Sequence, residues 1–173
     1  MHFASAPSKP SIFPPMNAPH RKSSAYVEAI VREAVARVLR SVRLPLKDAG
    51  YEGPRSTLVL SDVQHDFLAG YLYGALQRLL ELGELNEEED IGKATHRLYC
   101  GLFGFEDNEY GPWHTWVIRE GLHHFQRPDV FLGYCTGRND VLSQLRFGGT
   151  HNALADALRH LDDEGTEPLF GVG

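Results

Sequence analysis

Apolar residues recur at helical spacing through most of the chain, and one stretch is apolar on several sides. It runs from Ser61 to Gly83. One leucine stripe consists of Leu68, Leu72, Leu76 and Leu79, and other apolar residues lie away from it. Ser61 and Gln64 have the spacing of a capping box, and glycine at 83 is typical of a helix end. A helix that is apolar nearly all round is normally surrounded by other elements. The pattern predicts a central helix near 62–82.

A second stretch, Ser24 to Arg43, has the pattern of an amphipathic helix. The predicted buried side consists of Val27, Ile30, Val31, Ala34, Val35, Val38 and Val42. The predicted exposed side carries Arg32, Arg37, Arg40 and Arg43. Ion pairs four residues apart, Glu28 with Arg32 and Glu33 with Arg37, would stabilise it. Pro45 should end this helix, because the residue before a proline disfavours helical geometry.

The remaining segments are shorter. We predict helices over Glu87–Phe103 (with a capping box from Asn86 and Glu89), Pro112–Phe125, Asp140–Phe147 and Thr150–Leu161. Residues 130–135 fit either a buried strand or a short helix, and residues 57–60 fit a short strand. We detect no internal repeat. His65 is expected to be half-buried at the start of the central helix.

These elements together predict a mostly α fold, a single compact bundle of five or six helices around the central one, with at most a short strand. Residues 1–23 contain five prolines and no acidic residue, which favours a disordered, Pro/Ser-rich basic arm. The helical domain should span 24–165, followed by a frayed tail over 166–173. Met16 is an alternative start of the chain.

The composition is that of an ordinary globular protein, with 42% hydrophobic and 23% charged residues. No apolar run approaches the roughly 18 residues that a membrane span needs. The N-terminus lacks the apolar core of a signal peptide. Two cysteines, Cys100 and Cys135, do not make a disulfide scaffold. We therefore expect a cytoplasmic protein that does not enter the membrane.

Charge is distributed unevenly along the chain. Residues 1–47 hold eight lysines and arginines against two glutamates, whereas residues 48–173 hold nine against twenty-one acidic residues. The basic first helix is expected to dock on the acidic body, and such asymmetry also suits recognition of another protein. Self-association through the first helix is a related reading. Nucleic-acid binding through the arginine side is an alternative, disfavoured by the acidic body.

Catalytic motifs are lacking, so no catalytic residue is assigned and no cofactor is expected. The sequence has no nucleophile elbow, phosphate-binding loop or dinucleotide fingerprint. One chemical pattern remains, a carboxylate three residues before a histidine at Asp62/His65 and at Glu120/His123. On facing helices such pairs can hold a metal centre. The leading functional hypothesis is a non-enzymatic interaction module (a regulator, inhibitor or immunity-type protein), and the alternative is an enzyme or sensor with iron, manganese or zinc.

Overall fold

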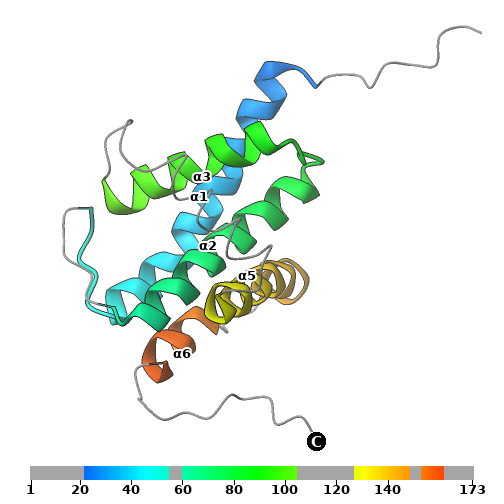
Figure 1. Cartoon of the computed structure of the whole chain (residues 1–173). Coiled ribbons are helices and arrows are strands. Elements are labelled where there is room, and N and C mark those ends of the chain that lie inside the picture. The colour runs from blue at the N-terminus through cyan, green and yellow to red at the C-terminus, as the bar shows by residue number, and fades with distance from the viewer. Residues whose placement is uncertain (1–21, 55–59, 105–126, 149–152, 162–173) are drawn as a thin grey trace, which may run out of the picture.

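The computed structural model describes residues 22–54, 60–104, 127–148 and 153–161 (Figure 1). These ranges form five helices: α1 (Ser24–Asp48), α2 (Asp62–Leu82), α3 (Glu88–Phe103), α5 (Pro128–Phe147) and α6 (Ala153–His160). They contain no strand. The predicted mostly α bundle is confirmed. None of these helices has the length and hydropathy needed to cross a bilayer.

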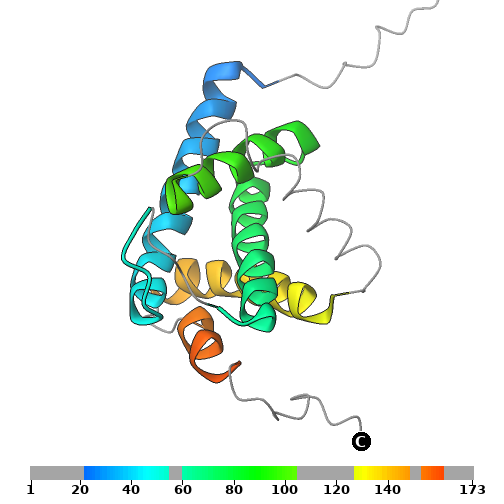
Figure 2. The same cartoon turned by 60° about the vertical axis from the view of Figure 1, so that its left-hand side comes forward.

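Helix α2 is the centre of the bundle, as the sequence predicts. In Figure 2 it stands upright in the middle, with α1 beside it, α3 near its upper end, α5 crossing its lower half and α6 below. Leu72, Leu76 and Leu80 are completely buried. The predicted capping box forms at its start: the Ser61 hydroxyl accepts from the Gln64 amide, and the Gln64 side chain accepts from the Ser61 amide. Helix α2 therefore has the predicted boundaries and neighbours on several sides.

Helix α1 presents its valine side to the core, and the four arginines predicted to be exposed are exposed. The predicted end is wrong, because α1 continues through Pro45 to Asp48. Pro45 and Leu46 are both buried, and the Tyr51 hydroxyl just beyond donates to the Leu102 carbonyl of α3. Burial of this last turn outweighs the local preference of proline to stop a helix.

Helix α3 buries one side, which consists of Ile91, Ala94, Thr95, Leu98 and Leu102. Its predicted capping box does not form. The helix begins one residue later, with Glu87 at the N-cap position and no side-chain cap. Glu89 pairs instead with Lys93, 2.6 Å away and one turn further along α3. In the described part of the last helix, Leu154 and Leu158 are buried.

Helix α5 is the largest departure from the sequence prediction. A strand or short helix over 130–135 and a separate helix over Asp140–Phe147 were expected, but one helix runs from Pro128 to Phe147. Gly137 does not break it. A methyl group on Gly137 would collide with the Tyr71 carbonyl oxygen of α2. The glycine is needed for close packing, not for a turn.

Helices α2 and α5 cross with their backbones in contact, through two matching motifs. Residues 66–74 read DFLAGYLYG and residues 129–137 read DVFLGYCTG, with Asp, Gly, Tyr and Gly at equivalent positions. Side chains added at Gly70 and Gly74 would strike the α5 backbone, and side chains added at Gly133 and Gly137 would strike the α2 backbone. The contacts are reciprocal. The expectation of no internal repeat is therefore wrong for this pair of helices.

The polar contacts of the crossing are also reciprocal, so a local twofold axis relates the two motifs. The Tyr71 hydroxyl donates to the Asp140 carboxylate at 2.8 Å, and the Tyr134 hydroxyl donates to the Gln77 side chain at 2.7 Å. Asp140 is the equivalent of Gln77 in the second motif. Desolvation, reinforced by the neighbouring Asp140 carboxylate, raises the pKa of Tyr71. A buried phenol with an acceptor is thus part of the crossing.

Several predictions lie outside the described residues. They are the helix over 112–125, the strand over 57–60 apart from Leu60, the tail, and the arm apart from its last two residues. Of those two, Ser23 caps α1, and the Lys22 ammonium donates to the Glu84 carbonyl after α2 at 2.6 Å. These two residues, the only ones of the predicted arm that the structure describes, contact the helical domain.

Candidate binding groove

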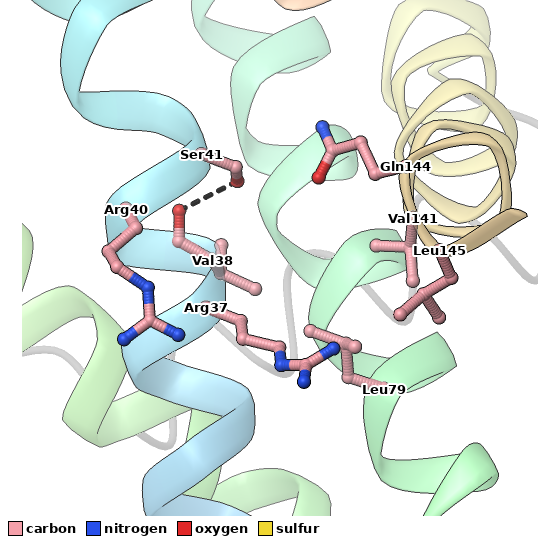
Figure 3. A pocket seen from close by; sticks show the side chains of 8 residues that line it. All are labelled: Arg37, Val38, Arg40, Ser41, Leu79, Val141, Gln144 and Leu145. Carbon is pink, nitrogen blue, oxygen red and sulfur yellow. Dashed lines mark hydrogen bonds between the residues drawn. The ribbon is translucent and has the colours of Figure 1, made fainter. Parts of the chain in front are cut away.

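A groove lies between α1 and α5, with α2 as its floor (Figure 3). Within the described chain, α1 and α5 each pack on α2, but their backbones do not approach each other closely. The space left between them measures about 350 Å³. It is lined by Arg37, Val38, Arg40 and Ser41 of α1, Leu79 of α2, and Val141, Gln144 and Leu145 of α5. The size is at the lower end of the roughly 300–1,000 Å³ typical of binding pockets.

The floor and the α5 side of the groove are mostly apolar. Figure 3 shows Val141 and Leu145 projecting from α5, and Leu79 of α2 between the two walls. Leu145 is 49% exposed. Leu44 is 66% exposed and follows Arg37 by almost two helical turns, so it extends the same side of α1. Apolar side chains are therefore exposed at the edges of the groove.

The α1 side of the groove is basic. Arg37 Nε donates to Glu33 Oε1 at 2.9 Å, which confirms the predicted pair, and Arg40 donates to the same oxygen at 3.4 Å. These hydrogen bonds, the one from Arg37 foremost, lower the pKa of Glu33. All three side chains are exposed, so solvent screens the pairs strongly. One carboxylate oxygen thus serves two arginines at the edge of an apolar groove.

The other arginines of the predicted basic side, Arg32 and Arg43, do not line the groove. The predicted pair of Glu28 with Arg32 is replaced by a 2.6 Å contact between Glu28 and Arg97 of α3. This bond to Arg97 is the main cause that lowers the pKa of Glu28. In the described chain α1 does pack on α2 and α3, but it does so through buried valines and not through ion pairs between its four arginines and those helices.

The predicted metal residues are only partly described. Asp62 and His65 stand at the start of α2, and both are exposed, so the expected half-burial of His65 is wrong. Gln64 takes the buried position and donates to the Leu158 carbonyl of α6 at 2.9 Å. Glu120 and His123 lie outside the described residues. Within the described ranges no three metal-ligating side chains gather. Metal binding stays a prediction.

The sequence reading missed an ion pair where α2 and α5 begin. Arg127 donates to both oxygens of Asp66, with its Nε at 2.9 Å. Asp129 lies nearby, and desolvation, with a further contribution from the Asp66 charge, raises the pKa of Asp129. Asp66 and Asp129 hold equivalent positions in the two motifs. This match in the sequence could have indicated that the starts of α2 and α5 lie close together.

Comparison with known proteins does not assign this chain. No protein-family model matches the sequence, and neither a curated protein nor a solved structure gives a match. The functional argument therefore depends on the groove and its surroundings.

Proposed function

We propose that this protein is a non-enzymatic interaction module that binds a segment of a partner protein in the groove between α1 and α5. The observation that supports this is the open space between two helices that share a floor and whose backbones do not approach each other closely, with Leu145 exposed at its edge. Exposed apolar residues beside charged ones are common where proteins associate.

The chemistry of the lining favours binding over catalysis. Its polar groups are two arginines, Ser41 and Gln144. The Ser41 hydroxyl donates to the Val38 carbonyl at 2.9 Å, a local helix contact. The described residues that line the groove include no histidine or carboxylate that could act as its base. Residues of this kind hold a ligand by contact and charge. A regulator, inhibitor or immunity-type protein is the class of function that fits.

The test is site-specific photocrosslinking in the native cells. A photoreactive amino acid replaces Leu145, and a matched control carries it at Ser143, which is exposed on the same helix but does not line the groove. The crosslinked segment is identified by mass spectrometry, synthesised as a peptide and titrated against the purified protein. We expect a product from position 145 that is lacking from position 143, and a peptide affinity that falls at least tenfold in Leu145→Asp.

Two results would overturn the proposal. One is the same crosslinking pattern from both positions. The other is a duplex DNA or RNA probe that binds with steep salt dependence and is lost equally in Arg32→Glu/Arg43→Glu and Arg37→Glu/Arg40→Glu. That second result would replace the groove with the whole basic side of α1 as the functional surface.

A further inference from the structure

Building on the proposed function, we infer that the partner segment is an acidic amphipathic helix, and that Glu33 occupies the place of its carboxylate until it binds. The two sides of the groove differ in charge. The α1 side carries Arg37 and Arg40, whereas the α5 side consists of the uncharged Val141, Gln144 and Leu145. A ligand that complements both sides has one acidic edge and one apolar edge.

The shape of the groove favours a helix as the occupant. Its two walls are helices, and within the described ranges no strand offers an edge for an extended peptide. Recognition by strand addition needs such an edge, whereas an amphipathic helix inserts side chains spaced by three or four residues into a groove. A volume of about 350 Å³ suits a few inserted side chains. The body of the helix would remain outside, between Leu44 and Leu145.

The arginines retain capacity for a second carboxylate. A guanidinium has five N–H donors, and the structure gives Arg37 and Arg40 one contact each, both to Glu33 Oε1. Glu33 is itself 57% exposed at its side chain. A partner carboxylate can therefore share or take over this position without opening the core. Bidentate binding by arginine would make the new contact stronger than the present one.

Charge complementarity also separates the groove from the remainder of α1. Arg32 and Arg43 are exposed on the same helix but lie outside the groove lining. If the acidic edge reads Arg37 and Arg40, reversal of these two charges must matter more than reversal of the other two. General attraction between a basic helix and an acidic peptide would treat the two pairs alike.

The experiment uses a phage-displayed library of amphipathic helical peptides whose flanking positions are randomised among glutamate, glutamine and lysine. Peptides are selected on the full chain and counter-selected on Leu145→Asp. We expect glutamate to be enriched on one flank at least tenfold over lysine. Selection on Arg37→Glu/Arg40→Glu should lose or invert this preference, whereas Arg32→Glu/Arg43→Glu should keep it. Circular dichroism checks that each variant is folded.

The role of Glu33 has its own readout. The best acidic peptide should bind Glu33→Gln at least threefold more tightly than the unaltered protein, because the competing carboxylate is gone. Glu28→Gln, an acidic residue of the same helix that pairs with Arg97, should leave affinity unchanged. The inference would be overturned if the selected peptides showed no preference for glutamate, or if Glu33→Gln bound the acidic peptide no more tightly than the unaltered protein does. If photocrosslinking at Leu145 still succeeds, the proposed function survives that failure.

Discussion

Helix α2 meets two neighbours in opposite ways. Against α5 it has glycines, and the two backbones touch, with no room for a methyl group on either side. Toward α1 it packs through side chains such as Val38 and Leu79, and beyond them the space opens into the groove. The difference teaches where each function of the helix lies. We expect the crossing with α5 to matter most for stability, and we propose that a ligand enters the opening between α1 and α5, where it would not disturb the core.

The largest expected effect is on the crossing. Gly133→Ala places a methyl group against the Phe67 carbonyl, so the helices must separate, and we expect a loss of about 3 kcal/mol in the free energy of unfolding. Gly92→Ala in α3 is the matched control, because nothing lies within 4 Å of the added methyl. It should stabilise by about 0.5–1 kcal/mol. Urea unfolding measures both, and equal effects would contradict the close crossing.

Loss of a buried hydroxyl should cost less. Tyr71→Phe removes a hydrogen bond to Asp140, which is only 7% exposed, and we expect a loss of about 1–3 kcal/mol. Tyr134→Phe removes the equivalent hydrogen bond, to Gln77, but Tyr134 is only half-buried. We therefore expect a smaller loss in the free energy of unfolding than for Tyr71→Phe. Thermal or urea unfolding ranks the two. If Tyr134→Phe proved the more damaging, burial would not be what sets the cost at this crossing.

The dependence of stability on pH in acid should reveal the contribution of the ion pair between Arg138 and Glu81, which lies beside the crossing. Hydrogen bonds from Arg138 hold the pKa of Glu81 below its ordinary value of 4.5, so the folded state binds its proton less readily than the unfolded chain does. The stability from this pair is complete above that value and is lost as pH falls through the lowered pKa. The curve of stability against pH should be flatter for Glu81→Gln below about pH 5.

Glu33→Gln is the control for this pH dependence of stability. The pKa of Glu33 is also lowered, but its pair is exposed, so its contribution should disappear in about 1 M salt, whereas that of the partly buried Glu81 should persist. If the contribution of Glu81 to the free energy of unfolding also disappeared in salt, then solvent would screen both ion pairs to the same extent.

The smallest effect on stability is expected in the groove. Leu145→Asp and Arg37→Gln change exposed side chains, so the free energy of unfolding should shift by no more than about 0.5 kcal/mol. Chemical denaturation measures this beside the peptide titration. A large loss of stability from either variant would mean that the groove belongs to the core, and the contrast between the two sides of α2 would fail.

By itself the sequence determined the central helix and the buried side of α1, but not the full extent of α1 or α5. Hydrophobic periodicity is local, so the central helix, its capping box and the valine side of α1 could be predicted from neighbouring residues alone. The same local rules failed at Pro45 and Gly137, where burial of Leu46 and the approach of α2 outweigh the usual effect of proline and glycine.

Only the tertiary structure decided how the helices meet. Whether Gly137 ends a helix or admits a neighbouring backbone depends on Tyr71, far away in the sequence. The groove depends on α1 and α5 both packing on α2 while their backbones do not approach each other closely, and no spacing along the chain encodes that gap. Arg37 and Arg40 could be named as surface charges in advance. Their place beside Leu79 and Leu145 follows from packing between distant segments, because side-chain volumes, not sequence intervals, set where helices leave space.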